Sequence, residues 1–558
     1  MTDFTLKKHP AFRGIDGALL LVILDGVGLY KGRAEGYEGN AVDIARTPNF
    51  DRLVERANHF IRLKAHGTAV GLPSDEDMGN SEVGHNALGA GRVFDQGAKL
   101  VSEAIESGRL FEGPAWKEIV AQAKGRGAAL HFIGLLSDGN VHSHIHHLFA
   151  LLRRAAQDGV GKIRVHPLAD GRDVNPVTFH LYGEQLESVL AGLRAKGCDA
   201  RVASGGGRMT TTMDRYNADW EMVRCGWRTH VLGEGRAFKS LAEAIQTLRA
   251  EKPGVIDQDL PAFVIADEQG KPVGPIVDGD AAVFFNFRGD RAIEISRAFA
   301  ERDFKEFDRV RAPKILYAGM MEYDGDLHIP PRYLVEPPAI SRTVSEYLAK
   351  NGVRQLAVAE TQKYGHVTYF WNGNNSEKFD SATETWVEAP SDRISFDKKP
   401  AMKAREVCQV VLEALESGRQ KFIRVNFANG DMVGHTGNLA AAVEAMETVD
   451  ECLGRLDEAV RRLGATMIVT ADHGNCDQMY EVDKKSGKTK LDAQGRPVVK
   501  TSHTLNPVPW VLVGKHADEF TVNTTIGTPG LGHVAATLLT LLGYEPPADY
   551  LPALVLPK

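Results

Sequence analysis

The chain is poor in cysteine, has no basic excess and contains no long apolar run. Its five cysteines include no C-x-x-C pair, so nothing indicates a disulfide framework or a thiolate zinc site. The net charge of -7 argues against a general binder of nucleic acid or anionic membrane. The longest apolar run, residues 18–24, is far too short to cross a bilayer, and residues 1–10 lack the core of a signal sequence. We therefore expect a cytoplasmic protein with no nucleic-acid or membrane partner.

The length and the apolar pattern indicate a multidomain α/β protein. A chain of 558 residues exceeds what one hydrophobic core supports, so two or more domains are expected. Short apolar runs rich in β-branched residues, each followed by a helix-like stretch, favour a largely parallel α/β architecture. The runs that we interpret as buried strands are residues 18–24, 130–136, 281–287, 422–427 and 465–470.

The residues just after these runs fall into two chemical groups. Ligands of open α/β sheets collect at the carboxyl ends of the strands, so these positions are the best candidates for a site. Carboxylates and histidines follow the runs near the two chain ends, whereas arginines and a histidine cluster follow the runs in the middle. This order predicts a metal-binding domain at 1–95 and 336–558, interrupted by a substrate-binding domain at 96–335. Glycine-rich and proline-rich stretches mark the expected joints.

A metal site is predicted from the first group. Asp431 and His435 are spaced i, i+4, which places both on one face of a helical turn. Alone, such a pair is more often a surface pair or a helix cap. Further candidates at other strand ends strengthen the metal interpretation: Asp25, Asp472, His473 and His503. Carboxylate and imidazole ligands without thiolate favour two borderline cations such as Mn²⁺, Zn²⁺ or Co²⁺, which could clamp a phosphoryl group.

Ser81 lies in a Gly-Asn-Ser turn that leads into a helix-like stretch. For an arbitrary serine in this position, an N-cap hydroxyl is the more common role. A serine at a helix start can also be a nucleophile, because backbone N–H groups there stabilise a phosphate and an adjacent cation activates the hydroxyl. The neighbouring metal candidates favour the nucleophile.

The second group predicts an anion site. Five arginines follow glycines, strand ends or acidic turns in the middle of the chain: Arg172, Arg208, Arg215, Arg288 and Arg291. Each alone is most often a surface charge, but together they match a small ligand that carries phosphate and carboxylate. The glycines at 205–207 form a turn or allow a close backbone approach to that ligand. We interpret His142 as a substrate hydrogen-bonding group, with His144, His146 and His147 on a helix surface, although the four could form another metal site.

These residues stand in phrases that resemble the cofactor-independent phosphoglycerate mutases of the alkaline-phosphatase-like superfamily. The phrases occur in the family's order over nearly the whole chain: LDGVG, GNSEVGH, SDGNVHSH, DGRDV, NFRGDRAIE, AETQKYGHVTYF, NGDMVGHTG, TADHGN and SHTLNPVP. The resemblance implies an alkaline-phosphatase-like α/β domain interrupted by a second α/β domain. The chain is similar to the longer form of the family, which occurs in plants and trypanosomatids. Asn140 is at a position where the family often has glycine.

The resemblance also implies roles for individual residues. One metal would be held by Asp431, His435 and His503, and the other by Asp25, Ser81, Asp472 and His473. Lys363 would contact the phosphoryl group beside the metals. The residues expected to bind glycerate or its phosphate are His142, Arg172, Asp173, Arg208, Arg215, Arg288 and Arg291. The implied cations are two divalent ions, with Mn²⁺ favoured over Co²⁺, Mg²⁺ and Zn²⁺.

The activity implied is interconversion of 3- and 2-phosphoglycerate through a phosphoserine at Ser81, in glycolysis and gluconeogenesis, by a monomer. Asp173 would exchange the hydroxyl proton of glycerate, and Lys363 would neutralise charge in the transition state. Two alternatives stay open. One is a plain metal-dependent phosphomonoesterase, against which the arginine set argues, and the other is a metal-bound binding protein without catalysis, against which Ser81 and Lys363 argue.

Overall fold

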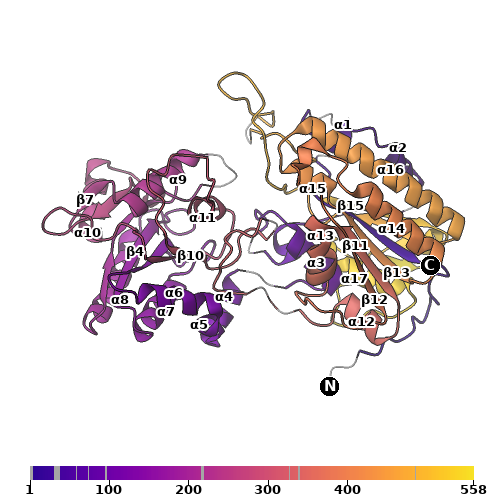
Figure 1. Cartoon of the computed structure of the whole chain (residues 1–558), viewed down its shortest axis with the longest axis horizontal. Coiled ribbons are helices and arrows are strands. Elements are labelled where there is room, and N and C mark those ends of the chain that lie inside the picture. Colours follow the sequence, from indigo (N-terminus) through magenta and orange to yellow (C-terminus); the bar gives the residue numbers. More distant parts are fainter. Residues whose placement is uncertain are drawn as a thin grey trace. The chain divides into compact units, whose positions relative to one another are not determined.

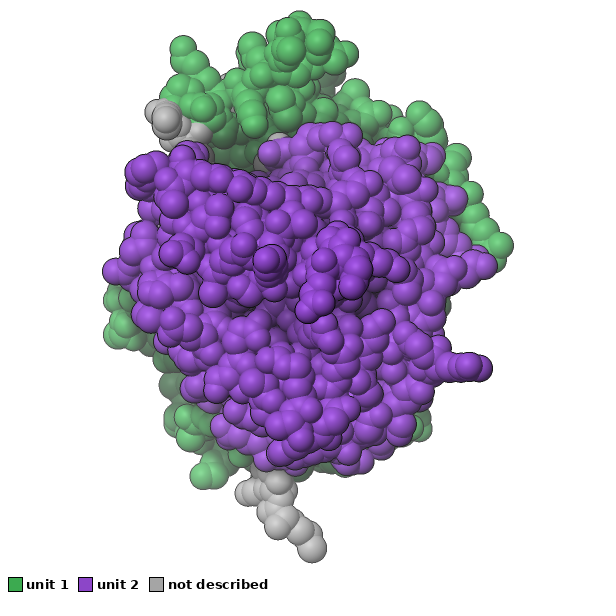
Figure 2. All heavy atoms as spheres, turned by 90° about the vertical axis from the view of Figure 1, so that its left-hand side faces the viewer, with its two compact units in different colours: residues 1–94, 338–558 green, residues 95–337 purple. Residues whose placement is uncertain are grey.

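The computed structural model describes residues 4–30, 38–57, 59–72, 74–94, 97–214, 219–325, 327–336, 338, 340–483 and 486–558. The chain forms two compact units, coloured separately in Figure 2. Unit 1 comprises Met1–Phe94 and Pro338–Lys558, and unit 2 comprises Asp95–Pro337. Among the described residues, no helix combines the length and apolar character that a membrane span requires.

Unit 1 is built on a seven-stranded sheet in the order β12-β11-β13-β1-β14-β15-β2. The first five strands are parallel, and β15 runs antiparallel to both β14 and β2. Their bounds are β1 (Leu19–Leu24), β2 (Phe60–Leu63), β11 (Gln355–Glu360), β12 (Glu384–Ala389), β13 (Phe422–Phe427), β14 (Thr466–Thr470) and β15 (Val508–Gly514). A separate pair joins β16 (Phe520–Val522) to β17 (Val555–Pro557).

Helices cover this sheet, as Figure 1 shows. The longest is α16 (Leu439–Leu463), which packs against α14 (Ala404–Ser417). The side chain of Asn438 caps the start of α16, and Gly464 ends it in the left-handed region with φ 63°. The other α-helices described in unit 1 are α1 (Ala41–Ile44), α2 (Pro48–Arg56), α3 (Ser81–Ala90), α12 (Val344–Lys350), α13 (Thr361–Gly365), α15 (Asn429–Gly434) and α17 (Val534–Leu541).

Unit 2 has its own sheet, in the order β10-β9-β3-β4-β6-β8-β7, with β5 paired to β4. Strands β10, β9, β3, β4 and β6 are parallel, and β8 is antiparallel to β6. Their bounds are β3 (Leu130–Leu135), β4 (Lys162–Ala169), β5 (Asp199–Val202), β6 (Ser204–Gly207), β7 (Arg236–Phe238), β8 (Phe263–Ile265), β9 (Ala281–Phe284) and β10 (Leu316–Gly319). Its described α-helices are α4 (Ala98–Glu106), α5 (Arg109–Glu112), α6 (Pro114–Ala123), α7 (Ile145–Gln157), α8 (Phe179–Arg194), α9 (Trp220–Trp227), α10 (Leu241–Glu251) and α11 (Ile293–Ala300).

The predicted α/β architecture is confirmed, and all five predicted strands are present. Every residue of β1, β3, β9, β13 and β14 is buried, which explains why apolar residues predominate in these strands. Strand β9 ends at Phe284, three residues earlier than predicted. Beyond it the side chain of Asn286 accepts a hydrogen bond from Leu135 N–H, and Phe287 N–H donates to the carbonyl of His142 instead of continuing the ladder.

Residues 205–207 do not form a turn, which was the alternative to a close backbone approach, because they make up most of β6. A Cβ at Gly205 would lie 2.6 Å from the carbonyl oxygen of Pro167, and one at Gly207 would lie 2.2 Å from that of Gln258. Both distances are too short for any side chain. The glycines therefore allow close packing of the sheet itself.

Candidate functional site

Four neighbouring parallel strands of unit 1 end side by side at one edge of the sheet. In sheet order they are β11, β13, β1 and β14, and they lead to Lys363, Asp431, Asp25 and Asp472 respectively. Parallel strands bring their carboxyl ends to the same edge. Strand β15 is antiparallel, so the segment before it, which carries His503, reaches this edge as well.

Ser81 is the first residue of α3, and its hydroxyl points into this cluster. The helix is capped by Asn80, whose Oδ1 accepts a hydrogen bond of 3.0 Å from Val83 N–H, so Ser81 is not the N-cap. The Ser81 Oγ lies 3.1 Å from Asp25 Oδ1 and 2.9 Å from His473 Nε2. Its backbone also accepts a bond from the His85 ring. The serine is fully buried.

Asp431, His435 and His503 converge on one point. Asp431 Oδ1 lies 3.2 Å from Nε2 of each histidine, and the two Nε2 atoms are 3.2 Å apart. Each Nδ1 is 2.8 Å from a backbone carbonyl, that of Thr501 for His435 and that of Gly79 for His503. A carbonyl only accepts, so each Nδ1 carries the proton and two Nε2 lone pairs face a carboxylate oxygen. This arrangement is repulsive alone and suits a cation, because metal-bound histidines commonly donate their other N–H to a carbonyl.

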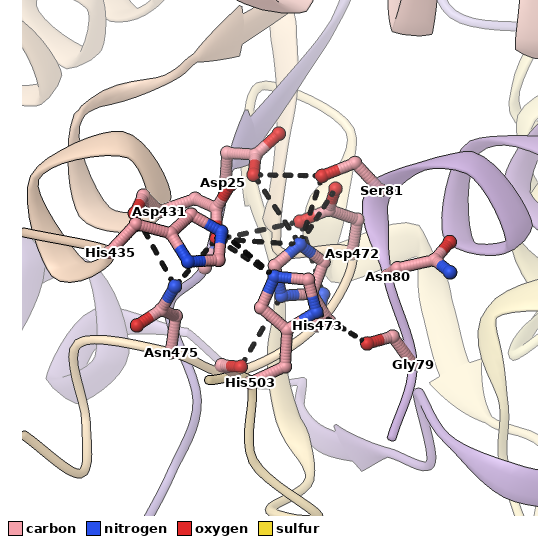
Figure 3. Close-up of polar contacts among 12 residues, drawn as sticks. Asp25, Gly79, Asn80, Ser81, Asp431, His435, Asp472, His473, Asn475 and His503 are labelled. Carbon is pink, nitrogen blue, oxygen red and sulfur yellow. Dashed lines mark hydrogen bonds and ion pairs between the residues drawn. The ribbon is translucent and has the colours of Figure 1, made fainter. Parts of the chain in front are cut away.

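His473 lies among the carboxylates of both implied metal positions. Its Nε2 is 3.5 Å from Asp25 Oδ1, 3.8 Å from Asp472 Oδ2 and 3.9 Å from Asp431 Oδ1. Burial opposes a charge on this ring, but the three carboxylates together raise the pKa of His473 to about 10. Burial opposes a charge on Asp431 as well, but His435 and the Lys363 ammonium, with a smaller effect of His473, hold the pKa of Asp431 well below its usual value. The cluster thus attracts positive charge. Figure 3 shows these side chains turned toward one another: Asp25, Ser81, Asp431, His435, Asp472, His473 and His503.

Two groups of described residues have the spacing of a metal site, with ligand atoms within 4.8 Å of one another. They are Asp431, His473 and His503, and Asp25, His85 and Asp472. The sequence prediction did not include His85. Its Nδ1 lies 3.3 Å from Asp472 Oδ2, and it follows Ser81 by one turn of α3. That i, i+4 spacing in GNSEVGH was the available signal.

Lys363 is fully buried and contacts both halves of the cluster. Its Nζ lies 2.6 Å from Ser81 Oγ, 2.7 Å from Asp431 Oδ2 and 3.2 Å from Asp25 Oδ1. Gly26, next to Asp25, allows the backbone at Asp431 to pack closely against it. It has φ 72°, and a Cβ there would lie 2.6 Å from Asp431 Cα.

The anion-binding candidates lie at the carboxyl ends of the strands of unit 2. Two of them are connected by Asp290, whose Oδ1 lies 3.4 Å from His142 Nδ1 and 3.2 Å from Arg288 Nε. Arg291 Nη1 donates a 2.5 Å hydrogen bond to the carbonyl of Met213. His142 and both arginines are buried. Asp290, which the sequence analysis did not single out, stands inside the NFRGDR phrase.

Arg208 is also buried, and two carboxylates hold it. Its Nη1 lies 2.8 Å from Asp170 Oδ1 and also contacts Asp173. Asp170, a further residue that the prediction omitted, accepts a 2.6 Å bond from the hydroxyl of Ser137. Arg172 is exposed, and Arg215 lies outside the described residues.

A model of the metalloenzyme superfamily matches residues 17–546 of the chain. The chain is 52% identical to the 2,3-bisphosphoglycerate-independent phosphoglycerate mutase of Trypanosoma brucei brucei, with 96% of this chain and 97% of that protein covered. It is 51% identical to the enzyme of that name from Zea mays, with 98% and 97% covered. The chain belongs to the 2,3-bisphosphoglycerate-independent phosphoglycerate mutases. A structure described as Leishmania mexicana phosphoglycerate mutase at low cobalt concentration matches with TM-score 0.63 and 50% identity, covering 99% of this chain and 100% of that one.

Membership of this family agrees with the donor set in unit 1. A divalent cation requires carboxylate or imidazole donors that converge without protons between them, and the Asp431, His435 and His503 group meets that requirement. Divalent metal binding by this metalloenzyme is therefore supported by both family and geometry.

Two predictions for residues 137–147, which comprise the phrase SDGNVHSH and the next three residues, had different outcomes. Asn140 has φ 57°, a conformation that glycine adopts freely and asparagine tolerates, so the substitution keeps the turn. The placement of His147 on a helix surface is wrong. It faces inward from α7, where its Nε2 lies 2.9 Å from the Ser102 hydroxyl, and burial lowers its pKa to about 4. His144 caps α7, and His146 is exposed.

Proposed function

We propose that this chain interconverts 3-phosphoglycerate and 2-phosphoglycerate through a phosphoserine at Ser81, as a step of glycolysis and gluconeogenesis. The observation that carries the proposal is the environment of the Ser81 hydroxyl, which lies within hydrogen-bond distance of Asp25, His473 and Lys363. A buried serine at a helix start, beside a converging set of carboxylates and imidazoles, is equipped for phosphoryl transfer. The names of relatives that match almost the full chain support the same activity.

Two divalent cations complete this site. Asp431, His435 and His503 would hold one, and Asp25, Ser81, Asp472 and His473 the other. When bound, the cations neutralise phosphoryl oxygens and favour the alkoxide form of the serine. His85, on α3, contacts Asp472 through its ring nitrogen Nδ1, which lies 3.3 Å from Asp472 Oδ2.

Each of the site residues would have a separate role in the reaction. Ser81 Oγ attacks the phosphorus of 3-phosphoglycerate, the bond to the C3 oxygen breaks, and the proton released by the serine ends on that oxygen. Lys363 Nζ donates to the reacting oxygens, and the first N–H groups of α3 add their dipoles. The second half reverses these events at the C2 hydroxyl, with Asp173 taking its proton. The glycerate ligands would be His142, Arg172, Arg208, Arg215, Arg288 and Arg291.

Three finer assignments belong to the proposal. We propose Mn²⁺ as the favoured ion, because mixed carboxylate and imidazole ligation suits it, with Co²⁺, Mg²⁺ and Zn²⁺ as competitors. We propose a monomer in the cytoplasm. Activity of metal-stripped enzyme restored by each ion in turn tests the first assignment, and sedimentation of the active enzyme tests the second.

The test of the function is a coupled assay for interconversion without added 2,3-bisphosphoglycerate, before and after chelation. Ser81→Ala should abolish interconversion, and chelation should do so reversibly. Ser107→Ala, an exposed serine that follows α4, is the matched control and should keep full activity. Appreciable mutase activity in the Ser81→Ala variant would exclude the phosphoserine route. Release of free phosphate at the rate of turnover would instead identify a phosphomonoesterase.

A further inference from the structure

Three buried histidines in the interior of unit 2 form one continuous hydrogen-bonded chain. The chain starts at Asp280, whose Oδ2 lies 3.1 Å from His131 Nε2. His131 Nδ1 lies 2.9 Å from His166 Nε2, and His166 Nδ1 lies 2.6 Å from the Ser204 hydroxyl. That hydroxyl is 2.7 Å from His230 Nδ1. All five residues are at most 2% exposed.

This histidine chain runs from strand to strand across the sheet. Asp280 precedes β9, and the next three members belong to β3, β4 and β6, which are neighbours in that order. His230 lies on the short π-helix η3 (Arg228–Leu232). Its Nε2 lies 2.9 Å from the hydroxyl of Thr212. The chain therefore ends in the segment 208–214, which also carries Arg208.

A single arrangement of hydrogens satisfies every contact. Burial lowers the pKa of each of the three histidines, so each is a neutral ring with one donor and one acceptor. The Asp280 carboxylate only accepts, which makes His131 Nε2 the donor and His131 Nδ1 an acceptor. The same logic makes His166 donate to His131, Ser204 to His166, and His230 Nδ1 to Ser204. His230 Nε2 is then an acceptor, and the Thr212 hydroxyl donates to it.

Thr212 is a residue that needs such an anchor. Its φ of 73° lies in the left-handed region, which a β-branched residue rarely adopts because its Cβ crowds the backbone there. Its N–H donates 2.9 Å to the carbonyl of Met222, and Gly226 leaves room for its side chain. The next residue, Met213, presents the carbonyl that receives Arg291. Thr212 thus sits between two proposed substrate ligands, Arg208 and Arg291.

We propose that this histidine chain positions segment 208–214, which carries the proposed substrate ligand Arg208. Asp280 sets the direction of the hydrogen bonds that pass through His131, His166 and Ser204. His230 Nε2 is therefore an acceptor that holds Thr212, and Thr212 in turn holds Arg208 and the Met213 carbonyl that orients Arg291. His230 and Thr212 are positioning residues. The inference rests on the proposed function, in which Arg208 and Arg291 bind the substrate. The hydrogen bonds and tautomers of the histidine chain do not depend on that function.

The kinetic test uses Thr212→Val, which keeps the β-branched shape and removes the hydroxyl. Loss of a buried hydrogen bond that opposes backbone strain should raise KM for 3-phosphoglycerate about 10-fold, with kcat changed less than threefold. Thr212→Ser retains the donor and should restore KM to within about twofold. His147→Asn is the matched control, a buried histidine of the same unit bonded to a serine but outside the chain. It should lower thermal stability and leave KM unchanged.

The structural test uses Asp280→Ala at the far end. This substitution removes the acceptor that makes His131 Nε2 the donor, so the direction of the hydrogen bonds along the histidine chain is no longer fixed. Nitrogen-15 NMR of histidine-labelled enzyme should show His230 Nε2 unprotonated in the wild type and both tautomers populated in Asp280→Ala, with a KM increase toward that of Thr212→Val. A protonated His230 Nε2 in the wild type, an unchanged tautomer in Asp280→Ala, or a normal KM in Thr212→Val would overturn the inference. A wild type without mutase activity would contradict the proposed function. In that case the His230 tautomer alone would show whether the histidine chain has the hydrogen-bond direction inferred here.

Discussion

At the scale of single residues, the site depends on histidine side chains whose tautomers are fixed by hydrogen bonds to backbone carbonyls. Carbonyl oxygens of Thr501 and Gly79 fix the tautomers of His435 and His503 and turn their lone pairs toward Asp431. Lys363 places its cation between Asp431, Asp25 and the Ser81 hydroxyl. The proposed metal ligands Asp25, Asp431 and Asp472 were predictable because each follows a strand. The supporting contacts were not, because they involve backbone atoms of loops that are distant in the sequence.

Removal of Lys363 tests its role at the reacting oxygens. Lys363→Met should lower kcat about 10²–10³-fold, because it deletes a preorganised donor in a buried site. Lys421→Met is the control, since that ammonium also contacts protein oxygens, namely the carbonyls of Ile15 and Gly17. It should reduce stability and leave kcat unchanged. Steady-state kinetics at saturating Mn²⁺ measures both variants, and a kcat within threefold of the wild type for Lys363→Met would contradict the role.

Removal of one imidazole tests the metal group. His503→Gln should weaken binding of the cation shared with Asp431 and His435 by at least about 10–100-fold, because it removes a converging lone pair. Isothermal titration of chelator-treated protein with Mn²⁺ measures this directly. His516→Gln, a buried histidine of the same unit that contacts Glu519, should bind Mn²⁺ as the wild type does. Equal affinities in all three proteins would remove His503 from the site.

At the scale of elements, parallel strands explain both what the sequence revealed and what it concealed. Asp25, Asp431 and Asp472 were found because each follows an apolar run, and a parallel sheet brings such positions together. His131 and His166 lie inside strands, where the spacing of residues along the sequence does not indicate which side chains of other strands they contact. Their partners belong to other strands, and only the sheet order makes them neighbours. The error at His147 has a similar origin, since its inward face depends on where α7 packs.

The histidine chain should make the stability of the protein sensitive to acid. Burial lowers the pKa of His230 to about 3, compared with about 6.5 in an unfolded chain. Between these values the unfolded state binds one more proton, so the free energy of unfolding falls as the pH drops below 6.5. At pH 5 the loss from His230 is about 2 kcal/mol. Urea unfolding at pH 7 and pH 5 measures it. The loss should be about 2 kcal/mol smaller in His230→Asn, and an equal loss in both proteins would contradict the shift.

At the scale of the whole molecule, two units carry two kinds of chemistry on two separate sheets. The sequence indicated this because the metal-type residues lie near the chain ends and the arginines lie between them. In unit 1 the acidic and imidazole ligands follow β1, β13 and β14, and in unit 2 the arginines follow β4, β6 and β9. The proposed division assigns phosphoryl transfer to unit 1 and recognition of glycerate to unit 2, so the two activities should be separable by mutation.

Arg288→Met should separate them. The substitution removes a buried guanidinium beside Asp290 and His142, and loss of one charged hydrogen-bonding group should lower kcat/KM for 3-phosphoglycerate about 10–100-fold. Transfer from p-nitrophenyl phosphate to Ser81 requires no glycerate site, so its rate should stay within twofold of the wild type. Mass spectrometry of the phosphorylated peptide measures that transfer, and a coupled assay measures the mutase reaction. Arg297→Met, a half-buried arginine of α11 paired with Glu301, is the matched control and should alter neither rate. A parallel fall of both activities in Arg288→Met would show that recognition and transfer are not divided between the units.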